Sequence, residues 1–160
     1  MEFVVSPSTL KGNIAIPGSK SHTVRALVFG LLAEGESLIE EPLRSSDTES
    51  CLAMVQAFGA KVTIEGDRWK VRGVSGDVPV PEDVIDTGNS GTSLYIGMGV
   101  ASLAEGYTVF TGDRQIRSRP VGPLGDAIRR LGGEVISTRR NGNPPVVVKG
   151  RIAGGKTRIE

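Results

Sequence analysis

Hydrophobic residues gather in short runs whose spacing alternates between helical and strand-like. Residues 26–33 are almost all apolar, which is typical of a helix that is buried on most of its sides. Within 52–59 the apolar positions recur at helical spacing, which predicts an amphipathic helix. The next two runs, 61–64 and 68–72, flank a short turn and predict a β-hairpin.

The same order of elements occurs twice along the chain. In 15–73 a glycine-rich loop and an apolar helix precede a strand, a polar turn, a second helix and a hairpin, and 87–150 repeats this order. A second hairpin is expected from 134–138 and 145–149. Self-similarity of this kind indicates a duplicated structural unit. Each stretch is therefore predicted to be a βαβαββ unit, which makes the fold class α/β, or α+β when its layers are considered.

Three segments flank or join these units. Residues 10–16 predict a strand that leads into the first glycine-rich loop. Residues 74–86, rich in Gly, Val and Pro, are predicted to connect the units. Residues 151–160 loosely resemble 10–16, so we expect them to begin a third unit. On this interpretation the chain is truncated, or is one piece of a split protein.

Two helix starts are predicted from local signals. Ser46 followed by Glu49 fits a capping box, in which the serine caps the helix and the glutamate reaches back to it. In the second unit, Arg119 and Pro120 are expected to open the equivalent helix, because proline is well placed in a first helical turn.

Composition limits the classes of function. The 160 residues carry a net charge of +1, so no global field favours nucleic acid or an anionic membrane, and anion binding has to be local. Cys51 and His22 are each the single residue of their type, which excludes an internal disulfide and the usual zinc sites. Cys51 is expected to be a small buried hydrophobe. With no signal-peptide pattern and no apolar run of about 18 residues, we expect a cytoplasmic protein.

The loop Pro-Gly-Ser-Lys-Ser at 17–21 is the first candidate for chemistry. Glycine lets the backbone approach a ligand, and the free amides of the following helix form an anion site. Lys20 adds a mobile cation, and Arg25, about one turn farther on, could pair with a carboxylate or phosphate through two hydrogen bonds. Taken alone, this loop is equally compatible with a capped helix start and an exposed lysine. The spacing of a nucleotide P-loop is absent.

Two further segments change this picture. The loop Gly-Asn-Ser-Gly-Thr at 88–92 occupies the same place in the second unit and is a second anion cradle or a simple capped turn. Residues 113–120 hold three arginines, of which Arg119 lies near a helix start. Asp47 is expected to cap its helix or to orient the lysine. A solvated surface role is expected for the basic set Arg129, Arg130, Arg139 and Arg140.

These motifs resemble those of the 5-enolpyruvylshikimate-3-phosphate synthase family. The loop at 17–21 with Arg25 is similar to the first motif of the family, 88–92 to the second, and Arg-Ser-Arg-Pro-Val-Gly at 117–122 to the third. All three occur in the order and spacing of the family. The resemblance implies the enolpyruvyl transferase fold, with two domains of three βαβαββ units each, of which this chain has two. It also implies transfer of the carboxyvinyl group of phosphoenolpyruvate to the 5-hydroxyl of shikimate 3-phosphate, without a metal or organic cofactor.

The resemblance assigns roles to individual residues. Lys20 would be catalytic, contacting both substrates near the reacting centre, while Ser21 and Arg25 would bind shikimate 3-phosphate, Arg25 through its carboxylate. The phosphoenolpyruvate-binding residues would be Lys20, Asn89, Gly91 and Arg119.

The chain also departs from the family. Tyr95 replaces a usual arginine, Ile96 a usual proline, and Ser46 stands where a second acid is common. The acid/base carboxylates and further arginines of the family come from a C-terminal domain outside this sequence. Residues 1–14 would form a strand packed against that domain, so a complementing C-terminal half is an expected partner and this chain alone should be inactive.

Two alternatives stay open at this point. One is an enolpyruvyl transferase that acts on a nucleotide sugar, against which the first loop and Arg25 argue. The other is a non-catalytic binding or assembly module that retains the loops.

Overall fold

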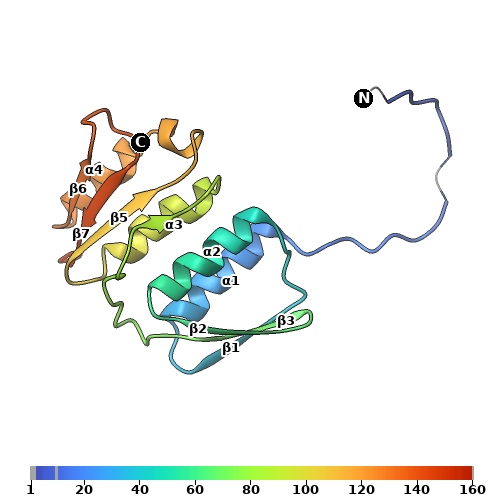
Figure 1. The fold of residues 1–160 in the computed structure, drawn as a ribbon, viewed down its shortest axis with the longest axis horizontal. Coiled ribbons are helices and arrows are strands. Elements are labelled where there is room, and N and C mark those ends of the chain that lie inside the picture. The colour runs from blue at the N-terminus through green and yellow to red at the C-terminus, as the bar shows by residue number, and fades with distance from the viewer. Residues whose placement is uncertain (1–2, 10, 160) are drawn as a thin grey trace.

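The first unit is a three-stranded antiparallel sheet with two neighbouring helices packed on it (Figure 1). The computed structural model describes residues 3–9 and 11–159. Strand β3 lies between β1 and β2 and pairs antiparallel with both. The elements of this unit are α1 (Lys20–Leu32), β1 (Glu36–Glu40), α2 (Ser46–Ala57), β2 (Lys61–Glu65) and β3 (Arg68–Arg72).

The second unit has a four-stranded sheet in the order β4-β5-β7-β6. Its last three strands repeat the antiparallel order of the first sheet, and β4 adds a parallel edge strand next to β5. This unit has the predicted βαβαββ order. Its elements are β4 (Ile85–Asp86), α3 (Gly91–Ala101), β5 (Tyr107–Thr111), the short 3₁₀ helix η1 (Ile116–Ser118), α4 (Gly122–Arg130), β6 (Glu134–Ser137) and β7 (Val146–Lys149).

The first unit lacks the strand predicted at its start. Residues 3–9 and 11–16 form no strand and extend away from the sheets (Figure 1), with Ile14 and Ile16 83% and 79% exposed. Strand β1 is the edge of its sheet, whereas the equivalent β5 is paired with β4 on that side. A strand forms only when another strand provides hydrogen-bond partners for its backbone N–H and C=O groups, and among the described residues this segment has no such partner. The first unit is therefore αβαββ here. Packing of 1–14 against a further domain stays a prediction, and residues 1, 2 and 10 lie outside the description.

At the other end, residues 151–159 form neither helix nor strand. The amide of Ile152 donates to Ser102 and that of Ala153 donates to Leu131, at 3.0 and 2.8 Å, so the start of this segment packs on the second unit. That it begins a third unit stays a prediction, and residue 160 is not described.

Both predicted helix starts are wrong by one or more residues. Helix α2 is capped by Ser45, whose hydroxyl accepts from the Thr48 amide at 3.4 Å, while the Thr48 hydroxyl accepts from the Ser45 amide at 2.9 Å. Threonine thus takes the role assigned to Glu49. Helix α4 begins at Gly122 with Pro123 in its first turn, not at Arg119. The backbone of Arg119 is extended, because helical geometry is disfavoured for a residue that precedes proline.

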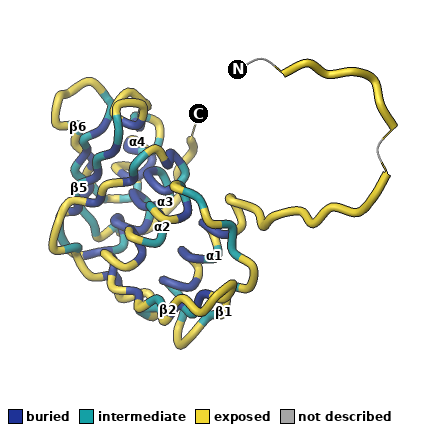
Figure 2. The backbone as a smooth tube through the Cα atoms, turned by 45° about the vertical axis from the view of Figure 1, so that its right-hand side comes forward, coloured by how far each residue is buried: buried dark blue, intermediate teal, exposed yellow. Residues whose placement is uncertain are grey.

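One hydrophobic core joins the two units. Figure 2 shows buried residues in α1, α2 and α3, and these three helices also contact one another. Phe58 of the first unit and Phe110 of the second lie with their ring centroids 6.4 Å apart. A Cβ added to Gly97 of α3 would lie 2.5 Å from the Met54 sulfur of α2, so only glycine fits this approach. The helices that carry the glycine-rich loops are therefore fixed relative to each other by shared packing.

Candidate functional site

The first loop is positioned by a close contact and an ion pair. A Cβ at Gly18 would lie 2.4 Å from the Glu41 carbonyl, so glycine lets the loop lie against the turn that follows β1. Ser19 caps α1, and Lys20 is the first residue of this helix. Its Nζ lies 2.6 Å from Oδ2 of Asp47, in the first turn of α2. Of the two roles expected for Asp47, capping its helix or orienting the lysine, this contact confirms the second. The Lys20 side chain stays half exposed, at 49%, and is available to a ligand.

Ser21 and Arg25 lie on the exposed side of the same helix start. The Arg25 Nη1 donates to the Ser21 carbonyl at 3.0 Å, which folds the guanidinium back toward the loop. Among the described ion pairs Arg25 has none, so this guanidinium retains N–H groups for an anion.

The second loop is built in the same way at the start of α3. Ser90 caps the helix by accepting from the Ser93 amide at 3.2 Å. Gly88 has a φ of +55°, and a Cβ there would lie 2.8 Å from the Ser50 hydroxyl on α2. The Asn89 side chain donates to Oδ2 of Asp113 at 2.8 Å. The loop is thus held from both sides, by α2 and by the turn after β5.

Arg119 reaches this second loop. A Cβ on Gly91 would lie 3.0 Å from Nη1 and 3.2 Å from Cζ of Arg119, so the guanidinium rests on the first residue of α3. The Tyr95 hydroxyl donates to the Pro120 carbonyl at 3.0 Å and supports the chain just after this arginine. The predicted proximity of Arg119 to a helix start is therefore correct, but the helix is α3 and not α4.

Helix α2 links the two loops. Asp47 and Ser50 are three residues apart, which places them on the same face of the helix. Asp47 pairs with Lys20 of the first loop, and Ser50 contacts Gly88 of the second. The N-termini of α1, α2 and α3 thus lie beside the two glycine-rich loops, together with the cationic side chains of Lys20 and Arg119. Because helix N-termini and cations both attract negative charge, this arrangement can bind anionic groups.

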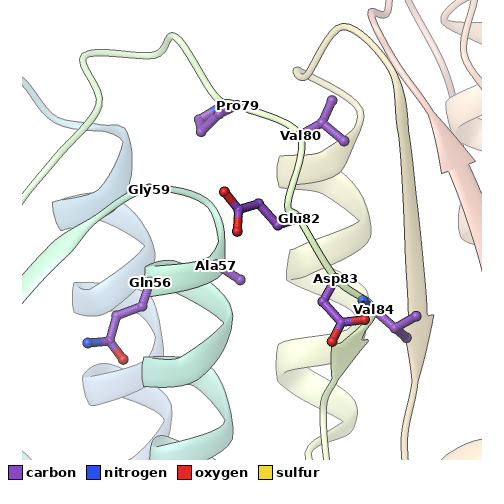
Figure 3. Close-up of a pocket in the computed structure, with 8 residues that line it drawn as sticks. All are labelled: Gln56, Ala57, Gly59, Pro79, Val80, Glu82, Asp83 and Val84. Carbon is purple, nitrogen blue, oxygen red and sulfur yellow. Dashed lines mark hydrogen bonds between the residues drawn. The ribbon is translucent and has the colours of Figure 1, made fainter.

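Other charged residues do not join this site. Arg117 donates to the Gly112 carbonyl and, with Arg114 and Arg139, lines a separate polar hollow. The expected surface role is confirmed by exposure for Arg129, Arg130, Arg139 and Arg140. A hollow of about 470 Å³ lies at the far end of α2 from Asp47 and contains none of the predicted site residues (Figure 3).

Cys51 is fully buried, as expected, and its thiol lies 3.7 Å from the Val24 carbonyl. Burial raises the pKa of this thiol to about 12, although a hydrogen bond with Ser93 acts in the opposite direction. The thiol is therefore neutral at physiological pH and packs as an apolar group. Within the described residues, no group of three or more potential metal ligands occurs, and no helix is long and apolar enough to cross a bilayer.

Sequence reasoning missed the role of Asp113, which it treated only as part of an arginine-rich turn. The internal repeat holds the missing signal. Asp113 lies between β5 and α4, and Asp47 lies in the first turn of α2, the helix that follows β1. Each aspartate contacts a polar side chain of the glycine-rich loop in its own unit.

Fold and site together define an α/β protein with duplicated units and a candidate anion site at its helix N-termini. The family model of EPSP synthase (3-phosphoshikimate 1-carboxyvinyltransferase) matches residues 4–160, and the chain belongs to this family.

Relatives are similar over the whole chain. A 3-phosphoshikimate 1-carboxyvinyltransferase of Acetivibrio thermocellus is 55% identical over 160 residues, which are 100% of this chain and 38% of that protein. A protein of the same name from Methanothermobacter thermautotrophicus is 49% identical, over 99% of this chain and 38% of its own length. The structure of EPSP synthase from Acinetobacter baumannii superposes with a TM-score of 0.82 at 28% identity, covering 88% of this chain and 32% of that one. The chain thus spans less than two fifths of these relatives.

Proposed function

We propose that this chain supplies a substrate-binding portion of a 3-phosphoshikimate 1-carboxyvinyltransferase. The reaction transfers the carboxyvinyl group of phosphoenolpyruvate to the 5-hydroxyl of shikimate 3-phosphate and releases phosphate. The observation that carries the proposal is the connection of the two loops through α2, with Lys20 held by Asp47 on one side and Arg119 resting on Gly91 on the other. Two anionic substrates need two neighbouring cationic sites, and family membership supports their identity.

The proposed roles follow the position of each residue. Lys20 contacts both substrates near the reacting centre. Ser21 and Arg25, on the exposed start of α1, bind shikimate 3-phosphate, with Arg25 on its carboxylate. Phosphoenolpyruvate lies at the start of α3, where its contacts are Lys20, Asn89, the amide of Gly91, and Arg119.

These groups contribute to catalysis by position and charge. Addition of the hydroxyl to phosphoenolpyruvate and elimination of phosphate both redistribute negative charge. Cations and amides that are already oriented stabilise such charge without reorganising during the reaction. The ion pair with Asp47 and the hydrogen bond from Asn89 to Asp113 supply that orientation before substrate arrives. The remaining acid/base groups are expected from a complementing C-terminal half, and we place the reaction in the cytoplasm.

The test joins residues 1–160 to the part of the Acetivibrio thermocellus relative that they do not cover. Phosphate release by this chimera is measured with both substrates, with either one omitted, and with the complete relative as the reference. Turnover that requires both substrates is the expected result, whereas the 160 residues alone should show none. A folded chimera that releases no phosphate, beside an active reference, would reject the proposal.

Binding separates this proposal from the nucleotide-sugar alternative. Titration of the chimera by calorimetry should give saturable binding of shikimate 3-phosphate, weakened by Arg25→Ala, and no binding of a uridine-diphosphate sugar. The opposite preference would support the alternative enzyme. Binding of the proposed substrates with no turnover would support a non-catalytic module.

A further inference from the structure

Asp113 makes four hydrogen bonds that connect the second loop to the arginine-bearing turn. Its Oδ2 accepts from the Asn89 side chain at 2.8 Å, and its Oδ1 accepts from the Ile116 amide at 2.9 Å. Its own amide donates to the Gly88 carbonyl at 2.8 Å, and its carbonyl accepts from the Arg117 amide at 2.9 Å. One residue therefore ties the glycine-rich loop to the start of η1.

The carboxylate also determines how Asn89 is oriented. An ionised carboxylate only accepts hydrogen bonds, so Asn89 has to turn its NH₂ group toward Asp113 and its carbonyl oxygen away. A neutral amide at position 113 could not impose this orientation, because an amide presents both a donor and an acceptor. The donors and acceptors that Asn89 offers to a ligand thus depend on the charge of Asp113.

The other carboxylate oxygen acts on Arg119 through the backbone. Oδ1 of Asp113 accepts from the amide of Ile116, the first residue of η1. At the end of this turn, the Arg119 amide donates to the Ile116 carbonyl at 3.0 Å. The Ile116 side chain is fully buried, so the turn has a fixed anchor. From there the Arg119 guanidinium extends over Gly91.

The first unit contains a similar contact between an aspartate and its glycine-rich loop. Asp47, in the first turn of α2, holds Lys20 of the first loop at 2.6 Å. In both units, a carboxylate that follows β1 or β5 along the chain holds a polar side chain of the glycine-rich loop in its own unit. The two contacts join residues 27 and 24 positions apart, respectively. The recurrence indicates a part of the site architecture and not a local accident of one turn.

We propose that Asp113 is a positioning residue for the anion site at the start of α3. It orients Asn89 and fixes the turn that presents Arg119, so that both face the same anionic ligand. This inference rests on the proposed function for the identity of that ligand, phosphoenolpyruvate. Asp113 itself, being negatively charged, contacts the protein and not the ligand.

The kinetic test uses the chimera described above with Asp113→Ala, Asp113→Asn and Asp113→Glu. Loss of one charge-assisted hydrogen bond corresponds to roughly a tenfold change in affinity. We therefore expect Asp113→Ala and Asp113→Asn to raise the KM for phosphoenolpyruvate about tenfold, with the KM for shikimate 3-phosphate changed less than about twofold. Asp113→Glu keeps the carboxylate and should recover most of the affinity. The matched control is Asp126→Asn, which removes an exposed aspartate that pairs with Arg129 on α4, and it should leave both constants unchanged.

The selectivity for one substrate distinguishes positioning from a general structural role. If both KM values rise together with a lower Tm, or if Asp113→Asn leaves the KM for phosphoenolpyruvate within about twofold, the inference is wrong. An inactive parent chimera would instead count against the proposed function.

A second measurement needs no turnover. In the ¹⁵N NMR spectrum of the 160-residue chain, Asp113→Asn should shift both the Asn89 side-chain amide and the Arg119 Nε–H resonances, and Asp126→Asn should shift neither. An Arg119 resonance that is unmoved by Asp113→Asn would overturn the positioning role even if the chimera proved inactive.

Discussion

Replacing Gly91 with alanine should weaken phosphoenolpyruvate binding while the protein stays folded. Gly91 is the first residue of α3, and the added methyl would lie 3.0 Å from Nη1, 3.2 Å from Cζ and 3.4 Å from Nε of Arg119. All three atoms belong to the end of a long, exposed side chain. The guanidinium can therefore move by a few tenths of an ångström, and the backbone of α3 need not move.

The two effects of this substitution differ in size. For folding, alanine is favoured over glycine in a helix by up to about 1 kcal/mol, and the crowding of Arg119 opposes this gain, so the net change should stay within about 1 kcal/mol. For binding, a hydrogen bond to a charged group contributes about 1.5–3 kcal/mol, and a displaced guanidinium loses part of it. A loss of about 1–2 kcal/mol corresponds to a KM for phosphoenolpyruvate that is raised roughly 5- to 30-fold.

The assay is steady-state phosphate release by the chimera, combined with thermal unfolding. Gly99→Ala is the matched control, because it makes the same change in the same helix at a position where a Cβ meets nothing within 4 Å. It should leave both KM values unchanged. The reasoning fails if Gly91→Ala leaves the KM for phosphoenolpyruvate within about twofold of the parent, or if both alanine variants change it equally.

Three further predictions concern packing, charge and pH. Gly97→Ala forces a methyl between two buried side chains of α2 and β5, and should lower the stability by about 1–2 kcal/mol, or the Tm by roughly 2–8 °C, in a thermal melt. Lys20→Met should reduce kcat/KM of the chimera by about 10²- to 10³-fold, as for loss of one preorganised charged donor. The Tm should change little, because the ion pair of Lys20 with Asp47 is partly exposed, and a large fall in Tm alongside the loss of activity would contradict this. Because burial raises the pKa of the Cys51 thiol from 9.0 to about 12, its neutral form stabilises the fold fully below about pH 9, and this contribution is lost as pH rises toward about 12. Between pH 8 and pH 10 the free energy of unfolding, measured with urea, should therefore fall by about 1 kcal/mol more in the parent chain than in Cys51→Ala, and equal losses would show that the thiol is not protected.

Local sequence signals predicted most of the elements. Both hairpins, the apolar helix of each unit and the two capped loops occur where the periodicity and the glycines indicated. The errors arose where a choice between neighbouring residues depends on tertiary contacts. Ser45 caps α2 in place of Ser46 because Thr48 is also held by the Leu43 carbonyl, at 2.8 Å. The strand expected at 10–16 is missing because hydrogen bonding between strands needs a partner that residues 11–16 do not have among the described residues.

By itself, the sequence determined the duplicated units, the two glycine-rich loops at helix starts and the cations that follow them. These depend on residues close together in the chain, through helical spacing, capping and the freedom of glycine. Only the tertiary structure decided which side chains meet. Lys20 and Asp47 lie 27 residues apart, Asn89 and Asp113 lie 24 apart, and Arg119 reaches α3 and not the helix that follows it. Such pairs depend on how the segments that follow β1 and β5 lie against the glycine-rich loops, and that is set by the packing of α1, α2 and α3 in one core.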